Sequence, residues 1–374
     1  MQQSLRIAIV TRSLMMGGTQ RHIVKLCRSL RQDDVSLAVF LLMHDEPQDL
    51  LPELQHTGAP VLISPFKRRD PRVARWLADS ISAMQANVVH SFLWTADAVT
   101  SFSKLVLGGP PLVCSERGDR GAGVYYSIAR NLYDRLVSFR IAKRFCANSN
   151  FGGNLLAREG CAPNKIRVIH NGVDLNHVDS SSPLDLRKTL QWPSACRIVG
   201  IVSRLDEYKG VDRLIHALAG IRDRTVRCVI IGDGPQRALL EQLTSDLRMN
   251  ERIAFMGTQK QVEPIIKGFD VAILATRTDT EHCSNSIMEY MACRRAVIAT
   301  SVGGNSELIE DGVSGFLVAP NDSAALGRAI EEMISNPTLS HRMGEAGRIR
   351  IEQEFNMKDV AGRFASLWYE VASI

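Results

Sequence analysis

The sequence predicts an α/β protein made of two doubly wound domains, each with a parallel sheet. Short apolar runs rich in β-branched residues alternate with helical stretches along most of the chain, which is typical of sheets covered by helices on both faces. The alternation pauses once, in a polar stretch at 179–194, and then restarts. A chain of 374 residues also exceeds the size that one hydrophobic core usually serves.

The elements of the first half are expected to begin with a strand at 5–11, a turn at Gly17 and Gly18, and a helix at 22–30. Further strands are expected at 35–42, 61–64, 87–92, 111–115, 144–148 and 167–174, with helices at about 71–85, 94–107 and 124–143. In the second half, strands are expected at 197–203, 226–232, 253–256, 271–275, 296–299 and 315–318, and the last helices at 323–334, 339–355 and 358–371. The expected domains are 1–178 and 195–357, joined by the linker 179–194.

Composition excludes several classes of protein. Hydrophobic residues make up 45% and charged residues 23% of the chain, as in ordinary soluble globular proteins. No apolar run reaches the ~18 residues of a membrane span, and the first residues lead directly into a strand, so a cytoplasmic location is expected. The eight cysteines form no C-x-x-C pair, which indicates reduced thiols and argues against disulfides or a zinc site.

The positive charge lies in the first half. The net charge is +5, with a balance of +7 up to Ser180 and −2 after it. The segment 117–144 alone holds seven basic and two acidic residues. Because this excess is not accompanied by a recognised nucleic-acid-binding module, no nucleic-acid partner is expected.

The stretch 281–300 carries the strongest indication of a site. Two carboxylates, Glu281 and Glu289, are separated by seven residues, and a helix is expected to begin at Ser284 or Asn285. The unpaired amides at such a helix start favour an anion such as a phosphate; they belong to Asn285, Ser286 and Ile287. One carboxylate could then accept hydrogen bonds from ribose hydroxyls, while the other faces whatever the phosphate carries. The plainer alternative is a capped helix with two surface acids.

Two cations follow the first strand of the second half. Arg204 comes directly after the strand, and Lys209 lies five residues further on, at the entry to the next helix. This arrangement suits a pyrophosphate, because arginine can bind two oxygens and lysine acts as a point charge. The alternative is that both are solvated surface cations. Gly232 opens a Gly-Asp-Gly-Pro turn after the next strand, and by itself this turn is equally compatible with a structural role.

Taken together, these segments resemble the family-4 retaining glycosyltransferases of the GT-B fold. The resemblance covers nearly the whole chain in the family's order and is most specific in the second half. The segments that carry it are MGGTQRH, IHNGVD, RLDEYKG, VIIGDGPQRALLEQL, IAFMGTQ, and EHCSNSIME followed by MACRRAVIATSVGGNSELIEDGVSGFLV.

The resemblance implies two Rossmann-like domains facing a cleft, with the C-terminal helix 358–374 returning to the N-terminal domain. The donor, a nucleotide diphosphate sugar, would be held mainly by the C-terminal domain and the acceptor mainly by the N-terminal domain, with no cofactor and no metal. Arg204 and Lys209 would bind the diphosphate, Glu289 the ribose, and Glu281 would face the sugar. The remaining donor-binding residues would be Gly17, Gly18, Gly232, Gly257, Asn285, Ser286 and Ile287.

The charges that develop during sugar transfer support these roles independently. As the glycosidic bond breaks, negative charge accumulates on the diphosphate, and preorganised cations and helix amides stabilise it. No Asp-x-Asp metal signature follows a strand.

Two departures from the family pattern concern the sugar end of the site. Where relatives have Glu-Gly-x-Pro, this chain has Glu281-His282-Cys283-Ser284. Where several relatives have a histidine after the fifth strand of the first half, this chain reads CSERGDR, which places Arg117 there as a candidate catalytic residue. His90, at the end of the preceding strand, is a second candidate, and a structural histidine is the alternative.

The segment 124–145 combines aromatic and aliphatic residues with five basic ones. A basic amphipathic helix is typical of contact with an anionic membrane surface, while the alternative is a helix packed on the sheet with a solvated basic edge.

The expected function is transfer of a hexosyl or N-acetylhexosaminyl group, from a UDP-sugar in preference to a GDP-sugar, to a glycan or lipid-linked saccharide. A UDP-sugar epimerase and a non-catalytic sugar-nucleotide-binding partner remain alternatives. An NAD-dependent oxidoreductase fits poorly, because neither half has G-x-G-x-x-G followed by an acidic residue.

Overall fold

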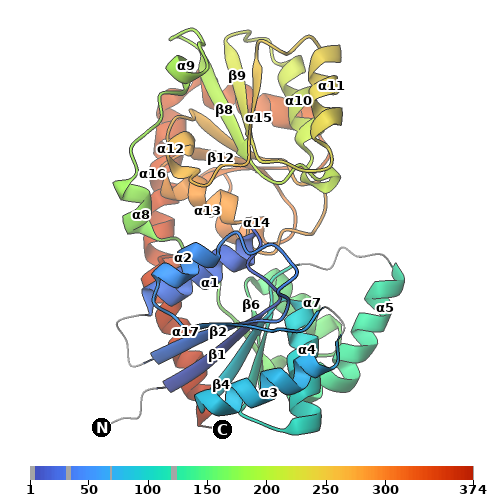
Figure 1. Cartoon of the computed structure of the whole chain (residues 1–374). Helices are drawn as coiled ribbons and strands as arrows, with labels where there is room; N and C mark the ends of the chain where they lie inside the picture. Colours follow the sequence, from blue (N-terminus) through green and yellow to red (C-terminus); the bar gives the residue numbers. More distant parts are fainter. Residues whose placement is uncertain (1–4, 31–34, 68–69, 119–123, 374) are drawn as a thin grey trace. The chain divides into compact units, whose positions relative to one another are not determined.

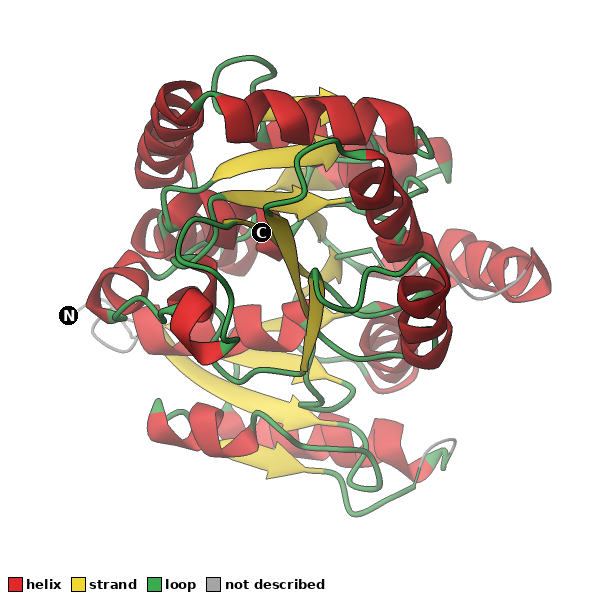
Figure 2. Ribbon diagram, turned by 90° about the horizontal axis from the view of Figure 1, so that it is seen from above, coloured by secondary structure: helices red, strands yellow, loops and turns green. Residues whose placement is uncertain are grey.

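The computed structural model describes residues 5–30, 35–67, 70–118 and 124–373. They form two compact units, the first from Met1–Gly172 with Met357–Ile374, and the second from Val173–Asn356. Each unit has one parallel sheet with helices on both faces, as Figures 1 and 2 show. The expectation of two doubly wound α/β domains is therefore confirmed.

The first unit holds a seven-stranded sheet in the order β3-β2-β1-β4-β5-β6-β7. Its strands are β1 (Leu5–Thr11), β2 (Val35–Leu41), β3 (Val61–Ile63), β4 (Val88–Phe92), β5 (Leu112–Glu116), β6 (Arg144–Ala147) and β7 (Ile166–Val168). Its helices are α1 (Gly18–Ser29), α2 (Leu51–His56), α3 (Arg72–Met84), α4 (Trp94–Leu107), α5 (Val124–Tyr133), η1 (Asp134–Ser138), α6 (Phe139–Ile141), α7 (Asn150–Arg158), η2 (Pro163–Lys165) and α17 (Met357–Ala372). Strands β1, β4 and β5 are buried almost throughout, as expected for strands covered on both faces.

The second unit holds a six-stranded sheet in the order β10-β9-β8-β11-β12-β13. Its strands are β8 (Arg197–Val202), β9 (Val226–Ile231), β10 (Ile253–Gly257), β11 (Val271–Leu274), β12 (Ala296–Thr300) and β13 (Gly315–Val318). Its helices are α8 (Leu175–Ser180), α9 (Leu186–Thr189), η3 (Glu207–Lys209), α10 (Val211–Gly220), α11 (Arg237–Asp246), α12 (Glu263–Ile266), α13 (Asn285–Ala292), α14 (Asn305–Leu308), α15 (Ser323–Ser335) and α16 (Pro337–Glu354).

The last helix, α17, belongs to the first unit, as the sequence had indicated. It packs against α1 and β4 and contributes Phe364, Leu367 and Trp368 to the core beneath β1. Glu370 fixes its far end, because the carboxylate pairs with Arg144 at 2.6 Å and with Arg167 at 2.9 Å.

The boundaries of the units differ from those expected. The chain passes from the first unit to the second between Gly172 and Val173, and the expected linker 179–194 lies inside the second unit. The reason is packing: the side chain of Leu186 on α9 is buried in the core of the second sheet, and Lys267 donates to the carbonyl oxygens of Val178 and Ser181 at 2.6 Å. The prolines of this stretch therefore mark turns of the second unit.

The helix expected at 124–143 is interrupted. α5 gives way to a π-helical turn, η1, and then to the short α6. Within the π turn, Asp134 and Ser138 are buried. The widened turn lets Asp134 point inward, where its Oδ1 accepts a hydrogen bond from the indole nitrogen of Trp94 at 3.3 Å.

In the part of the chain that the structure describes, no helix is long and apolar enough to cross a membrane.

Candidate donor site in the second unit

The strand order of the second sheet reverses between β8 and β11. Ligands of doubly wound sheets bind beyond the carboxyl ends of the strands at such a reversal. Lys209 follows β8 and Glu281 follows β11, so two of the residues expected to bind the donor belong to the loops at this position.

Lys209 and Glu281 form an ion pair. The ammonium nitrogen of Lys209 contacts Oε1 of Glu281, and the two side chains are only 17% and 10% exposed. The hydroxyl of Thr276 donates to the same oxygen at 2.9 Å. Among the described residues, both hydrogen bonds that this carboxylate accepts end on Oε1, which leaves Oε2 as an acceptor for another donor.

The loop that carries Lys209 is fastened to the end of β11. The amide of Arg277 donates to the carbonyl of Tyr208 at 2.7 Å, and the guanidinium of Arg277 pairs with Asp212 at the start of α10. Gly210 has a φ of +66°, and a Cβ there would collide with the carbonyl oxygen of Ala275. Glycine at this position therefore allows the two loops to approach closely, which brings Lys209 to Glu281.

Buried side chains that donate to neighbouring backbone carbonyls hold Thr276 in place beside Glu281. Thr300, at the end of β12, donates its hydroxyl to the carbonyl of Thr276 at 2.6 Å. Asn305 donates its amide to the carbonyl of Thr300 at 3.0 Å. Because β11 and β12 are adjacent strands in register, their carboxyl ends hold Thr276 and Thr300 next to each other.

The loop after β12 braces the backbone of Glu281. The amide of Gly304 donates to the carbonyl of Glu281 at 2.7 Å, and the amide of Gly303 donates to Oδ1 of Asp279 at 2.8 Å. Gly303 has a φ of +53°, and a Cβ there would collide with the carbonyl oxygen of Glu281. None of these supporting residues was singled out from the sequence; the glycine pair in SVGGNSE was the available signal.

Helix α13 begins where the sequence indicated. Ser284 is its N-cap and accepts a hydrogen bond from the amide of Ile287 at 3.4 Å. The hydroxyl of Ser286 donates to the carbonyl of Val202 at 2.7 Å, so it ties the helix start to the end of β8. The expectation that the Ile287 amide is unpaired is therefore wrong, because the cap uses it, and the Ser286 hydroxyl holds the helix in place.

Glu289 lies in the second turn of α13 and is 6% exposed. The sequence suggested that Glu289 forms one group with Arg204 and Lys209. In the structure, Lys209 pairs with Glu281, and Arg204 pairs with Asp206 at 3.0 Å. The Arg204 side chain is 68% exposed and is paired with Asp206. Its long, flexible side chain can turn without disturbing the core.

Gly232 directly follows β9, and Gly257 is the last residue of the neighbouring strand β10. The amide of Gly232 donates to the carbonyl of Gly257 at 2.9 Å, which joins the two turns. The turn after Gly232 is also bound to the loop of Arg204, because the amide of Leu205 donates to the carbonyl of Asp233 at 3.0 Å. The loops after β8, β9 and β10 therefore form one edge of the second unit.

The departure from Glu-Gly-x-Pro does not strain the backbone. His282, which replaces the family's glycine, has no positive φ and is 5% exposed. Ser284, which replaces the proline, has a φ of −71°, a value that proline also adopts. The loop thus keeps a backbone path that does not depend on the missing glycine and proline.

The candidate residues of the first unit are found at the start of a helix, for Gly17 and Gly18, and in the buried core, for His90. Gly17 is the N-cap of α1 with extended backbone, and Gly18 begins that helix after β1. His90 is fully buried: the indole nitrogen of Trp368 donates to its Nδ1 at 2.8 Å, and its Nε2 contacts the hydroxyl of Ser115 at 2.7 Å. Burial lowers the pKa of His90 well below the usual value, so the ring is neutral and joins α17 to the sheet.

Arg117 is also buried, at 7% exposure. Its Nη1 donates to Oδ1 of Asn171 at 2.5 Å, and its guanidinium lies over the rings of Phe92 and Phe364 at 5.0 and 5.5 Å. Its position and its neighbours are those of a cation packed inside the first unit. Asp119 and Arg120, which complete the CSERGDR motif, lie outside the described residues.

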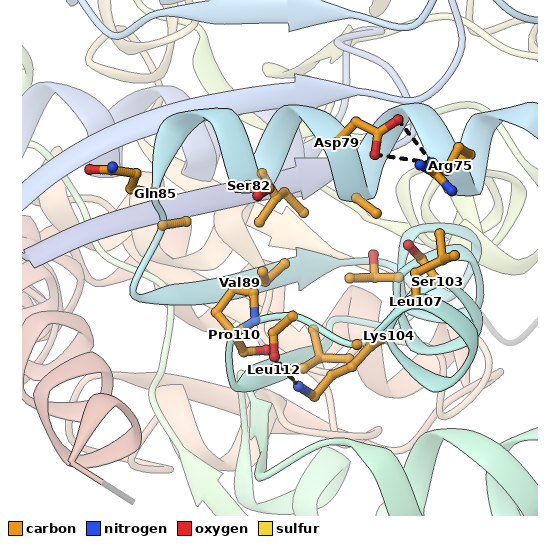
Figure 3. A pocket seen from close by; sticks show the side chains of 16 residues that line it. Arg75, Asp79, Ser82, Gln85, Val89, Ser103, Lys104, Leu107, Pro110 and Leu112 are labelled. Carbon is orange, nitrogen blue, oxygen red and sulfur yellow. Dashed lines mark hydrogen bonds and ion pairs between the residues drawn. The ribbon is translucent and has the colours of Figure 1, made fainter.

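A cavity of about 620 Å³ lies between α3 and α4 in the first unit, and Figure 3 shows the side chains that line it. Gln85 and Leu112 on its wall lie just before β4 and at the start of β5. The cavity is therefore at the amino ends of these strands, the edge opposite to the one where parallel sheets bind ligands. It does not contain any of the expected site residues.

Among the described residues, no group of three or more His, Cys, Asp or Glu side chains is arranged to hold a metal ion.

Comparison with protein families identifies the chain. The family model described as "Glycosyl transferases group 1" matches residues 184–350, and the model described as "Glycosyltransferase Family 4" matches residues 16–177. The chain belongs to the family-4 glycosyltransferases. The two matches cover most of the two units, in the order that the resemblance in the sequence had indicated.

Several curated proteins are similar to parts of this glycosyltransferase. N-acetyl-alpha-D-glucosaminyl L-malate synthase of Bacillus anthracis is 25% identical over 56% of this chain and 55% of its own length. The lipopolysaccharide core biosynthesis glycosyltransferase LpsE of Rhizobium meliloti is 28% identical over 54% of this chain and 57% of its own. A putative colanic acid biosynthesis glycosyltransferase, WcaL of Salmonella typhimurium, is 31% identical over 59% of this chain and 54% of its own length. The matched region thus spans about half the length of these relatives.

Solved structures share the fold over the whole chain. The Anabaena protein Alr3699/HepE, crystallised with UDP and glucose, has a TM-score of 0.87 at 22% identity and covers 98% of this chain and 100% of its own. Sucrose-phosphate synthase from Thermosynechococcus elongatus has a TM-score of 0.82 at 20% identity, with 99% of both chains covered. At these identities the similarity establishes the GT-B fold.

Proposed function

We propose that this glycosyltransferase moves a sugar, with retention at the anomeric carbon, from a nucleotide diphosphate sugar to a saccharide or lipid-linked saccharide. The observation that carries the proposal is the pairing of Lys209 with Glu281 in the loops where the second sheet reverses its strand order. A cation for the diphosphate and a carboxylate for the sugar are thus held together where doubly wound sheets bind their ligands.

Each residue has a chemical role in this proposal. Lys209 and Arg204 neutralise the charge that builds up on the departing diphosphate, and the N-terminus of α13 adds its helix dipole. Glu281 keeps Oε2 available to accept a hydrogen bond from a sugar hydroxyl, because Lys209 and Thr276 both use Oε1. Glu289 holds the ribose hydroxyls.

The relatives support the choice of donor and acceptor. The names of LpsE and WcaL place those proteins in the synthesis of lipopolysaccharide core and colanic acid. The Anabaena protein has been crystallised with UDP, with UDP and glucose, and with UDP-glucose. We therefore favour a UDP-sugar over a GDP-sugar, a hexosyl or N-acetylhexosaminyl group, and a role in cell-surface polysaccharide or glycoconjugate synthesis at the inner face of the cytoplasmic membrane.

The reaction is proposed to need no metal and no cofactor. In metal-dependent transfer, a divalent cation neutralises the diphosphate. Here the ammonium of Lys209, the guanidinium of Arg204 and the start of α13 supply positive charge and hydrogen-bond donors for the same purpose.

The test is a panel of UDP- and GDP-sugars, with nucleotide release measured in the presence and absence of saccharide acceptors. Lys209→Ala and Glu289→Ala should each lower the rate by ~10²-fold or more. Lys188→Ala and Glu251→Gln change exposed residues elsewhere in the second unit and should leave the rate unchanged. No turnover with any donor, or equal rates in all four variants, would contradict the proposal.

The same experiment separates the alternatives. An epimerase would convert the UDP-sugar without an acceptor, while a non-catalytic binding protein would be stabilised by a nucleotide sugar and release no nucleotide. Retention is checked by the anomeric coupling constant of the product in a proton NMR spectrum.

A further inference from the structure

A small pocket lies at the amino edge of the second sheet, opposite to the edge that carries the candidate donor site. It has a volume of about 180 Å³, and the charged side chains in its lining include Arg197, Asp270, Arg294 and Arg295. Arg197 is the first residue of β8, while Asp270 and Arg295 directly precede β11 and β12. Because these strands are neighbours in a parallel sheet, their amino ends bring the charged side chains together. We call this site the amino-edge pocket.

The one carboxylate in the lining of the pocket is already used by other groups. Oδ2 of Asp270 accepts hydrogen bonds from Arg187 at 2.8 Å and from the amide of Ile198 at 2.7 Å. Its Oδ1 lies 3.8 Å from Arg197. Asp270 therefore compensates the charges of Arg187 and Arg197 before that of Arg295.

Arg295 is held in place by backbone carbonyl groups. Its Nε donates to the carbonyl of Cys293 at 2.9 Å, and its Nη1 donates to the carbonyl of Phe269 at 3.0 Å. The neighbouring carboxylates of Asp270 and Glu345 pair with other arginines. Burial lowers the pKa of Arg295, which is the expected effect on a cation that is partly removed from water. A fixed guanidinium that forms no ion pair among the described residues is prepared to bind an anion.

Arg294 occupies a backbone conformation that disfavours an arginine. Its φ is +57°, in the left-handed region, where a residue other than glycine costs about 1 kcal/mol or more. Its side chain is 46% exposed and pairs through Nη1 with Glu345 on α16. Because glycine would suit this backbone better, an arginine here indicates that its charged side chain contributes something.

The start of α16 completes the pocket. Pro337 and Ser340 belong to the first turn of this 18-residue helix and line the pocket. The N-terminus of a helix carries a partial positive charge, which adds to that of the arginines. Val271, Met333 and Ile334 supply apolar lining, and such surroundings strengthen the attraction between opposite charges.

We propose that the amino-edge pocket binds a phosphate group. Guanidinium groups bind phosphate oxygens through paired hydrogen bonds, and a helix N-terminus favours the same anion. The volume of about 180 Å³ holds roughly six water molecules and is smaller than the roughly 300–1,000 Å³ of pockets that enclose a whole ligand. It suits one phosphate group, either as free inorganic phosphate or on a metabolite whose remainder stays outside the pocket.

This binding is separate from sugar transfer. The pocket lies at the edge of the sheet opposite to Lys209 and Glu281, and its arginines were given no role in the donor site. The test below uses no nucleotide sugar and measures no turnover. Either proposal can therefore fail without the other.

The experiment is calorimetric titration of the full-length protein with inorganic phosphate and, separately, with glucose 1-phosphate, in a chloride buffer. The wild type should bind at least one of them with a dissociation constant below ~10 mM. Arg197→Gln with Arg294→Gly should weaken this binding at least about tenfold, because two of the three guanidinium groups are removed. Glycine suits the φ of +57° at Arg294, so this double variant should remain folded.

Two control variants separate the pocket from other effects. Arg248→Gly also removes an exposed arginine with a positive φ, of +54°, and lies before β10, three strands away from β11. Lys209→Ala changes the donor site. Both variants should keep the binding that the double variant loses, and thermal melting should show all of the proteins to be folded.

Three results would overturn the proposal. The first is no saturable binding of either compound by the wild type, and the second is equal binding by the double variant and Arg248→Gly. The third is binding that Lys209→Ala removes and the double variant keeps, because the phosphate would then occupy the donor site. Tighter binding of glucose 1-phosphate would support a phosphorylated metabolite as the occupant, and tighter binding of inorganic phosphate would support the free ion.

Discussion

The hydroxyl of Thr276 offers the sharpest test of how the donor site is held. Thr276→Val keeps the shape of the side chain and removes the buried hydrogen bond to Oε1 of Glu281, which is 2.9 Å long. A hydrogen bond to a charged group contributes about 1.5–3 kcal/mol. If that contribution is realised when the sugar is transferred, kcat should fall by roughly 10- to 150-fold, because 1.4 kcal/mol corresponds to about tenfold.

A matched control separates this effect from a loss of stability. Thr244 on α11 is also buried, and its hydroxyl donates to the carbonyl of Leu240 at 2.8 Å. Thr244→Val should therefore lower the melting temperature by a few degrees, as Thr276→Val does, and leave kcat unchanged. The assay is kcat and KM for the nucleotide sugar together with thermal melting of both variants. A Thr276→Val enzyme with kcat within about twofold of wild type would refute a positioning role for Thr276.

Three further predictions follow from other parts of the structure. Gly303→Ala should lower activity at least about tenfold, because a Cβ would collide with the carbonyl of Glu281. The control is Gly312→Ala, because Gly312 also has a positive φ but open space around its Cβ. Equal losses of activity in the two variants would contradict the idea that the loop of Gly303 positions Glu281. His22 is 2% exposed, and burial with the nearby Arg117 charge depresses its pKa. Below pH 6.5, the ordinary pKa of histidine, His22 is protonated in the unfolded chain and neutral in the folded one. The free energy of unfolding should therefore fall as the pH drops through 6.5, by about 1.4 kcal/mol for one such histidine at pH ~5.5. Urea unfolding at neutral and acidic pH should show a smaller loss for His22→Leu than for wild type, and an identical loss would contradict a neutral buried ring. Finally, EDTA should leave nucleotide release unchanged, and activity that EDTA removes and Mg²⁺ restores would disprove the metal-independent reaction.

The sheets could be predicted almost residue by residue from the sequence. Strands β1 and β13 match their expected bounds, and most of the others differ by a single residue, because strands buried on both faces appear as unbroken apolar runs. Short helices were missed, among them α8 and α9, because four to six residues give too few turns for a helical period to show. Because these two helices were not recognised, a stretch that folds as part of the second unit was predicted to be a linker.

The candidate site was only partly predictable. The spacing of Glu281 and Glu289 and the position of Lys209 could be read directly from the chain. The contacts of Glu281 could not, because Thr276, Thr300 and Gly303 come together only through the order of β8, β11 and β12. The pairing of Arg204 with Asp206, two residues apart in the loop after β8, was not predicted either. The approach of Gly17 and Gly18 to the donor stays a prediction.

The most direct test of the central claim is the affinity of the protein for its preferred nucleotide as diphosphate and as monophosphate, measured by calorimetry. If Lys209 and its neighbours hold the second phosphate, the diphosphate should bind roughly 10- to 100-fold more tightly, and Lys209→Ala should remove most of that difference. Equal affinities in the wild type, or a difference that survives Lys209→Ala, would contradict the assignment of the donor site to the end of β8.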